Sequence, residues 1–315
     1  MATGRWSWSP SPPDRFVTME HPLCLLAIHA HPDDEASKGA STVAKYHAEG
    51  VRTVLVCCTG GEEGDILNPA MDRPEVRENL GEVRRRELAD AAAVIGYDTV
   101  HMLGYRDSGM ADTEANAHPD CFAMAPLDEA VDRLVALLRA ERPHVVVTYP
   151  DDQGTYQHPD HLRVHDITHP AVACAADPAH RPELGEPWQV AKIYYSSWSR
   201  ARIEARHAAF LELGLESPYD SRWFDRPDQD HLITTRVAVA GFTDARRRGL
   251  LAHATQIDPD SSFWFGLPPE VDREIYPFDD YRLAAHHGSD GALIEAEPAG
   301  SEDDLFAGIR AEVCG

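Results

Sequence analysis

The stretch His29-Ala30-His31-Pro32-Asp33-Asp34-Glu35 decides the fold, because it closes an apolar run at residues 23–29 and leads into an amphipathic stretch at 38–49. A near-continuous apolar run is typical of a strand that is covered on both faces. Gly50 follows the amphipathic stretch and suits a helix C-cap. Strand, polar turn and helix in this order predict the first unit of a parallel sheet.

The same alternation continues along the chain. Four more strands are predicted at 53–58, 99–103, 144–149 and 190–196, with helices between them at 74–95 and 126–142. Beyond residue 198 we expect a cap that consists of a helix, a polar loop, a strand and a basic helix, at 200–213, 217–230, 232–240 and 243–256. The predicted fold class is therefore α/β, with a mostly parallel sheet, flanking helices and a C-terminal cap.

The chain of 315 residues is expected to form one α/β domain over residues 21–287, with the cap included from about residue 198. Residues 1–20 are rich in Trp, Ser and Pro and are interpreted as a disordered leader. Residues 288–315 are interpreted as a mobile tail, apart from a small apolar anchor at Leu305 and Phe306.

The charge balance excludes several classes of partner. The chain has 53 acidic against 29 basic side chains, a formal net charge of −24. Such a field repels phosphate backbones and anionic lipid headgroups, so we expect neither nucleic acid nor a membrane as partner. No apolar run approaches the length of a membrane span, and the six cysteines show no CxxC spacing, which fits a reducing cytoplasm. We therefore expect a small molecule as the partner. The sequence does not indicate the oligomeric state.

Two His-Pro-Asp clusters follow predicted strands and offer metal ligands. One is His31-Pro32-Asp33-Asp34 and the other is His158-Pro159-Asp160-His161. Loops at the carboxyl ends of parallel strands meet at one edge of the sheet, so His31, Asp34 and His161 can converge on one ion. Two imidazoles and a carboxylate suit Zn²⁺, and Fe²⁺ is also compatible with this set. The alternative is that the acids after residue 31 only complement the start of a helix.

Acids and glycines also fill the loops that follow the second and third strands, at 59–65 and 104–109. Their spacing matches neither GxGxxG nor a P-loop, and carboxylates suit sugar hydroxyls better than phosphates. Asp65 and Asp107 are therefore candidate substrate ligands. Arg84 is either a polar clamp for the substrate or, with its neighbours Arg85 and Arg86, part of a solvated basic face.

Other histidines have simpler interpretations. His165 and His169 continue a row of four-residue spacing from His161, but the glutamate of an HExxH zinc helix is missing. We interpret them as surface or packing side chains. The tripeptide His118-Pro119-Asp120 follows no predicted strand, and we interpret it as coincidence.

The pair of clusters at 30–35 and 158–161 resembles the zinc-dependent N-acetylglucosaminyl-phosphatidylinositol deacetylase-like family. The resemblance runs from about residue 23 to the tail and implies a Rossmann-like sheet and a zinc ion held by His31, Asp34 and His161. It implies Asp33 as general base, His158 as protonated acid or oxyanion donor, Asp160 as the group that orients His158, and Tyr156 as a further donor to the oxyanion.

Within the family, the segments 38–40, 60–72, 107–109 and 253–259 are similar to the branch that acts on S-conjugates of the thiol mycothiol. In that branch Lys38 is expected to grip the longer cysteinyl portion, beside the substrate ligands Asp65, Arg84 and Asp107. The loop 149–158 is one residue longer than is usual, and Asp65 stands where the family more often has Glu.

We therefore expect a zinc amidohydrolase that cleaves the amide of a small-molecule thiol conjugate. One alternative is a pathway-specific enzyme that trims a conjugated natural product such as a lincosamide. Another is the sister N-acetylglucosaminyl-inositol deacetylase. An alternative of another class is a protein that binds a sugar or polyol on the same acidic loops without turnover.

Overall fold

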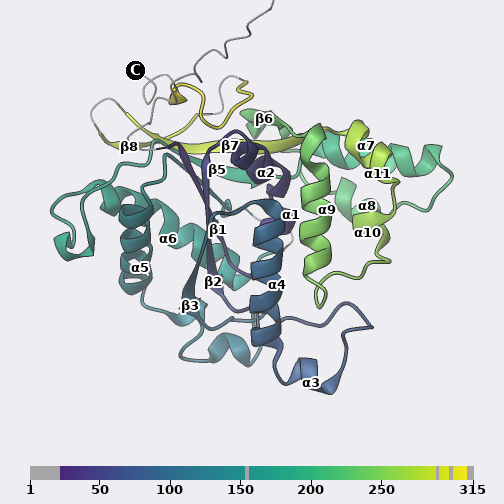
Figure 1. Ribbon diagram of the computed structural model, residues 1–315, viewed down its shortest axis with the longest axis horizontal. Helices are drawn as coiled ribbons and strands as arrows, with labels where there is room; N and C mark the ends of the chain where they lie inside the picture. Colours follow the sequence, from purple (N-terminus) through teal and green to yellow (C-terminus); the bar gives the residue numbers. More distant parts are fainter. Residues whose placement is uncertain (1–21, 153–155, 289–290, 298–300, 311–315) are drawn as a thin grey trace, which may run out of the picture.

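The computed structural model describes residues 22–152, 156–288, 291–297 and 301–310, and its centre is one mixed sheet (Figure 1). Five strands are parallel: β1 (Cys24–His29), β2 (Arg52–Thr59), β3 (Thr99–Tyr105), β4 (Val145–Thr148) and β5 (Lys192–Ser197). The antiparallel part consists of β6 (Thr235–Ala238), β7 (Phe278–His287) and β8 (Leu293–Glu295). The predicted α/β class and mostly parallel sheet are confirmed.

The strand order creates a crevice beside β1. The sheet runs β3-β2-β1-β4-β5-β7-β6, and β8 pairs with β7. The chain moves outward from β1 to β2 and β3 on one side and then to β4 and β5 on the other. Ligands of open α/β sheets bind at such a reversal, outside the carboxyl ends of the strands. The two His-Pro-Asp clusters follow β1 and β4, the two strands at this point.

Helices cover both faces of the sheet (Figure 1). One face packs on α5 (Leu127–Glu141) and α6 (Pro159–Ala176). The other packs on α2 (Ala40–Ala48), α4 (Leu80–Ile95) and α9 (Thr243–Ala252). Alternate residues of β1 serve the two layers, with Leu26 in the first and Leu25 in the second. This explains why β1 is apolar up to its last residue, His29, since a strand with two buried faces has no polar side.

The cap has an apolar cluster of its own. It contains α7 (Arg200–Glu212), α8 (Ser221–Phe224), α10 (Ser262–Phe265) and α11 (Pro269–Ile275), which lie together beside α9 in Figure 1. Phe210, Tyr219 and Leu267 are buried among them. The strand expected at 232–240 is β6, which joins the central sheet through β7. The cap is therefore continuous with the sheet.

Some element boundaries differ from the prediction. The helix expected at 74–95 is interrupted after α3 (Pro74–Arg77) and resumes as α4, and the helix expected at 243–256 ends at Ala252. A four-residue helix, α1 (Asp34–Ser37), precedes α2. Strands β7 and β8 were not predicted from the sequence. Short 3-10 turns occur at Ala115–Ala117, Phe122–Met124, Pro182–Leu184, Asp230–Leu232 and Ala240–Phe242.

The two ends of the chain are described in part. The expected leader at 1–20 lies outside the described residues. Within the expected tail, β8 pairs with β7, and the anchor residues Leu305 and Phe306 are buried, with Phe306 packed edge-on against Tyr46. Among the helices of the described ranges, none combines the length and the apolar character that crossing a membrane requires.

Candidate functional site

The two His-Pro-Asp clusters meet at the carboxyl edge of the sheet and form a compact triad of possible metal ligands. Nε2 of His161 lies 3.3 Å from Oδ2 of Asp34, and Nδ1 of His31 lies 3.6 Å from the same oxygen. All three side chains are buried, and their ligand atoms lie within 4.8 Å of one another. The convergence predicted for His31, Asp34 and His161 is present.

The donor set fits a divalent metal ion. One carboxylate oxygen of Asp34 faces two imidazole nitrogens, and two histidines with one carboxylate are a set that zinc and other borderline metals bind. Although burial opposes ionisation, Lys38 and His161 hold the pKa of Asp34 well below its usual value. A carboxylate that stays ionised while buried is ready to bind a cation.

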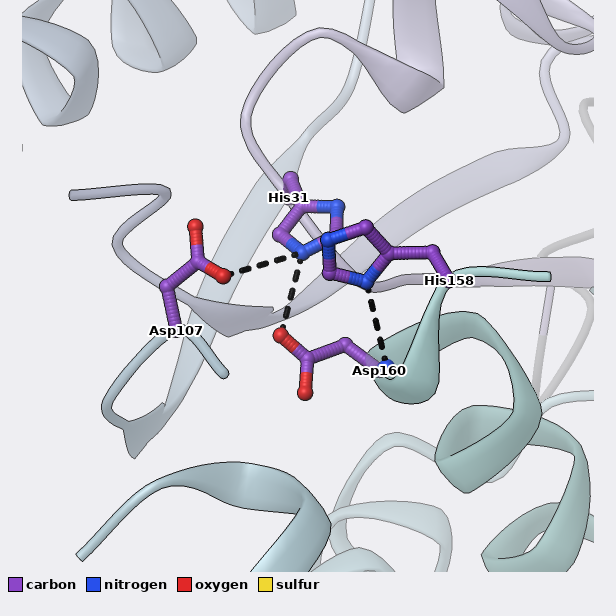
Figure 2. Close-up of side chains that lie close together, drawn as sticks. All are labelled: His31, Asp107, His158 and Asp160. Carbon is purple, nitrogen blue, oxygen red and sulfur yellow. Dashed lines mark hydrogen bonds and ion pairs between the residues drawn. The ribbon is translucent and has the colours of Figure 1, made fainter. Parts of the chain in front are cut away.

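The second nitrogen of His31 is bound by carboxylates. Nε2 of His31 lies 3.1 Å from Oδ2 of Asp160 and 3.6 Å from Oδ1 of Asp107, as Figure 2 shows. Asp160 is fully buried and also accepts hydrogen bonds from the backbone N–H and the hydroxyl of Ser108. These contacts fix the ring of His31 so that Nδ1 points to Asp34. A carboxylate on the far nitrogen of a ligand histidine is the usual outer support of a metal site.

His158 is oriented by the first turn of α6. Its Nδ1 accepts a hydrogen bond from the backbone N–H of Asp160 at 3.2 Å, so its ring proton lies on Nε2 (Figure 2). Burial, and then the positive charge of His31, lowers the pKa of His158 to about 4, whereas the charge of Asp160 raises it. The carboxylate of Asp160 itself contacts His31 and Ser108. Of the two roles expected for His158, this arrangement favours the oxyanion donor.

Asp33 occupies the turn between β1 and α1 in an unusual backbone conformation. Its φ is +118°, in the region that residues with a side chain rarely adopt. Such strain is found where a side chain is held in place for function. Oδ2 of Asp33 accepts a hydrogen bond from Nη2 of Arg84 at 3.0 Å. Burial raises the pKa of Asp33, and the Arg84 guanidinium opposes that rise.

Arg84 is buried, so it is not part of a solvated basic face. It donates to the carbonyl oxygens of Gly61 and Pro32 as well as to Asp33. Gly61 and Gly64 make room for it, because a Cβ atom would lie 2.4 Å from Nη1 of Arg84 at Gly61 and 2.5 Å at Gly64. The glycines of this loop therefore accommodate a guanidinium. Arg85, by contrast, is exposed and pairs with Glu82.

A pocket of about 370 Å³ opens beside the triad. Its walls include most of the predicted substrate and catalytic residues: Asp33, Asp65, Arg84, Asp107, Tyr156 and His158. Asp107 is buried, whereas Asp65 and Tyr156 are exposed. Lys38 is not among the described residues that line this pocket. Its ammonium contacts Asp34 and lies 5.5 Å from the ring centroid of Tyr149.

The segment 253–256 makes several hydrogen bonds near the pocket, and the sequence predicted no role for its individual residues. His253 Nε2 lies 2.5 Å from Oε1 of Glu35, and both side chains are fully buried. Thr255 binds Glu87 through its backbone N–H and its hydroxyl, at 2.9 and 2.6 Å. Gln256 lines the pocket and donates to the carbonyl of Asp65 at 3.0 Å. The segment 253–259, one of those that carry the family resemblance, is the sequence signal for these residues.

The remaining histidines lie where the sequence interpretation expected them. His165 Nδ1 lies 3.2 Å from the carbonyl oxygen of Tyr149, and His169 Nε2 lies 2.6 Å from the hydroxyl of Tyr195. Both are packing contacts of α6. Nδ1 of His118 accepts from the backbone N–H of Asp120 in a local turn, and neither residue lines the pocket beside the triad.

Comparison with known proteins finds relatives along nearly the whole chain. The chain is 44% identical over 301 residues to a mycothiol S-conjugate amidase of Streptomyces coelicolor. The alignment covers 93% of this chain and 99% of that protein. It is 42% identical to a 1D-myo-inositol 2-acetamido-2-deoxy-alpha-D-glucopyranoside deacetylase of Geodermatophilus obscurus, with 90% and 97% covered. In fold it is similar to the N,N'-diacetylchitobiose deacetylase of Pyrococcus horikoshii, with a TM-score of 0.55, 19% identity and coverage of 82% and 83%.

The family is also matched directly, because residues 26–172 correspond to PIG-L, described as GlcNAc-PI de-N-acetylase. That segment contains the whole triad from β1 to α6. The chain belongs to the PIG-L family of metal-dependent hydrolases that act on amide bonds, as its two His-Pro-Asp clusters had indicated.

Proposed function

We propose that the protein is an amidase of mycothiol S-conjugates. It would hydrolyse the amide between glucosaminyl-inositol and an S-substituted N-acetylcysteine. The observation that carries this proposal is the 44% identity to a mycothiol S-conjugate amidase along nearly the whole of both chains. The buried triad and the acid-lined pocket beside it are the arrangement that such a hydrolysis needs.

His31, Asp34 and His161 would hold the metal ion. Zn²⁺ suits the donor set and hydrolytic chemistry best, and Fe²⁺ is the second metal that the set would accept. When bound, the metal supplies a Lewis acid that polarises the amide carbonyl and activates water. Asp160 and Asp107 would keep the ring of His31 in the tautomer with its proton on Nε2, so that Nδ1 is free to bind.

Asp33 would serve as the general base. It lies next to the ligand Asp34 in the sequence, and the backbone of the turn directs the two carboxylates differently, with Asp34 on the histidines and Asp33 on Arg84. Burial raises the pKa of Asp33, which brings a carboxylate closer to the value that an efficient base needs at neutral pH. Arg84 would act as a positioning residue for this base rather than as a clamp on the sugar.

His158 and Tyr156 would act on the carbonyl oxygen. Both line the pocket from the segment that enters α6, and their ring centroids lie 6.1 Å apart. Neutral His158 carries its proton on Nε2 and can donate a hydrogen bond to a developing oxyanion, and the Tyr156 phenol can add a second. The proton that Asp33 accepts from water would then pass to the leaving amine, which restores the Asp33 carboxylate.

The acidic wall of the pocket would bind the sugar. Asp65 and Asp107 offer acceptor oxygens to hydroxyl groups, and Gln256 adds an amide next to Asp65. The side chain of Asp65 is one methylene shorter than the Glu that is more common in the family, so its carboxylate would reach less far toward a sugar hydroxyl. Lys38, on Asp34 and outside this pocket, would face the acyl half of the substrate, where a cysteinyl chain has carbonyls to bind.

A second candidate activity is deacetylation of N-acetylglucosaminyl-inositol. The relatives at 39–42% identity that are named as deacetylases of this sugar favour it. Purified protein incubated with S-methyl mycothiol and with N-acetylglucosaminyl-inositol distinguishes the two by the rate of amine release. Faster cleavage of the acetyl substrate would replace the amidase proposal with the deacetylase. Bound metal without hydrolysis of either would indicate a sugar-binding protein.

A further inference from the structure

A second cavity, of about 440 Å³, lies on the other side of the segment that carries Tyr156 and His158. Those two residues line the pocket beside the triad, while Gln157, between them in the chain, lines the second cavity. Three consecutive residues therefore alternate between the two spaces. The segment 156–158 is a shared wall, and the second cavity adjoins the reaction centre.

The triad belongs to the first pocket, and the second cavity begins beside it, after β4. The pocket beside the triad draws its walls mainly from the loops after β1, β2 and β3. The second cavity draws its walls from the residues after β4, the end of β5, β7 and the cap, including Pro150, Ser196 and Arg282. Since His161 follows β4 and Gln157 of the same segment lines the second cavity, the metal ligands lie at the end of the first pocket that adjoins the second cavity.

Much of the lining of the second cavity is aromatic or apolar. Tyr195, Trp198, Trp223, Ile203 and Ile233 contribute to it. The rings of Trp198 and Trp223 lie with centroids 6.3 Å apart and planes at 29°. Both rings also stack on Phe263, so the cavity meets an apolar wall that is held in place by its own packing. The volume lies within the range of small-molecule sites.

The same cavity also has polar lining residues. Asp152, which precedes the His158 segment, accepts a hydrogen bond from Gln229 of the cap at 2.9 Å and lies 3.7 Å from the guanidinium of Arg282. Arg226 lies over the ring of Trp223, with its guanidinium carbon 4.2 Å from the ring centroid. The lining therefore combines apolar side chains with hydrogen-bonding groups.

We propose that this cavity binds the S-substituent of the conjugate and selects bulky aromatic substituents. The proposal rests on the proposed amidase function. The sugar is polar and hydroxylated, so it matches the acidic pocket, whereas the thioether end is the part of such a substrate that can be apolar. The amide carbonyl at the triad then joins a sugar on the β1–β3 side to a thioether on the β5 side.

The test compares two conjugates that differ only in the S-substituent, S-benzyl and S-methyl mycothiol. Ser196 lines the cavity at the end of β5, and Ser196→Phe places a ring inside it. We expect the ratio of kcat/KM for the benzyl conjugate to that for the methyl conjugate to fall about tenfold or more, because apolar contacts of this size carry such discrimination. Ser301→Phe, at an exposed serine that lines neither cavity, is the matched control and should leave the ratio as it is in the wild type.

A second variant approaches the cavity from its aromatic wall. Trp223→Ala removes a half-buried ring rather than adding one, and it should also lower the benzyl-to-methyl ratio. N-acetyl-S-benzylcysteine, the product of the benzyl conjugate, should inhibit the wild type several-fold more strongly than either variant. An unchanged ratio and unchanged product inhibition in both variants would overturn this assignment. Wild-type protein that hydrolyses neither conjugate would instead refute the amidase function itself.

Discussion

Nε2 of His31 and the carboxylate of Asp160 lie 3.1 Å apart, although 129 residues separate them in the sequence. The contact joins the loop after β1 to the first turn of α6 and is closed off from solvent. It makes Nδ1 the nitrogen of His31 that faces Asp34 and His161. The geometry of the proposed metal site is therefore set by a side chain outside the triad.

Asp160→Asn should weaken metal binding while the fold persists. Asparagine keeps the size of the side chain but removes the negative charge that accepts from His31, and such outer partners of ligand histidines are worth about 10–100-fold in metal affinity. The affinity is measured by competition for Zn²⁺ with a chromophoric chelator. Asp166→Asn, on the exposed side of the same helix, is the control and should bind Zn²⁺ like the wild type. Equal affinities in the two variants would exclude the role given to Asp160.

Arg84→Met should lower kcat by about 10-fold or more without loss of the metal. The variant removes the hydrogen bond to Asp33 and the donors to two loop carbonyls, so the base is no longer held in its strained turn. Arg85→Met, which removes only an exposed partner of Glu82, is the matched control. Steady-state kinetics and metal content of both variants test this. A kcat in Arg84→Met equal to that of the control would show that Asp33 needs no support.

Arg84→Met should also change the pH dependence of kcat/KM. Arg84 is a positive charge that opposes the burial-driven rise in the pKa of Asp33, so its removal raises that pKa further. A general base works only when it is ionised, and a higher pKa moves ionisation to higher pH. The acid limb of the kcat/KM profile should therefore shift toward higher pH in Arg84→Met. A shift toward lower pH would mean that Asp33 is not the group that titrates in this limb.

Gly61→Ala should damage the site through Arg84. Gly61 has φ of +66°, and the added methyl group would lie 2.4 Å from the guanidinium. Gly50→Ala is a suitable control because Gly50 has φ of +82° but no neighbour within 4 Å of its Cβ position. We expect both variants to lose about 1 kcal/mol of unfolding free energy from backbone strain, and only Gly61→Ala to lose activity as well. Thermal unfolding and turnover measure the two effects, and full activity in Gly61→Ala would contradict the close packing.

The fold and the triad could be predicted because their signals are local. The apolar run of β1, the turn that starts at His31 and the repeat of the motif before α6 are each contained in a short stretch of sequence. Strand β7 is harder to recognise, since Phe278–His287 mixes acids, Arg282 and histidines with its apolar residues. Its partners β5, β6 and β8 satisfy its backbone, and this pairing depends on contacts between segments distant in sequence.

Two features of the site depend on contacts between segments distant in sequence. The carboxylate of Asp160 contacts His31, 129 residues away, while its backbone N–H binds the nearby His158. Arg84 sits in a run of three arginines, and only the packing of α4 against the loop at Gly61 reveals that one of them is buried. Burial, which lowers the pKa of His158, is likewise a property of the folded chain.

The sharpest division of roles is between the adjacent residues Asp33 and Asp34. Asp34 contacts both His31 and His161, so Asp34→Ala removes one of three proposed ligands and should abolish both metal binding and turnover. Asp33 contacts Arg84 instead, so Asp33→Ala should retain the metal and lose turnover, because water then has no base to accept its proton. Metal content by elemental analysis and amine release are measured on the same samples. Loss of metal in Asp33→Ala with retention in Asp34→Ala would require the two roles to be exchanged.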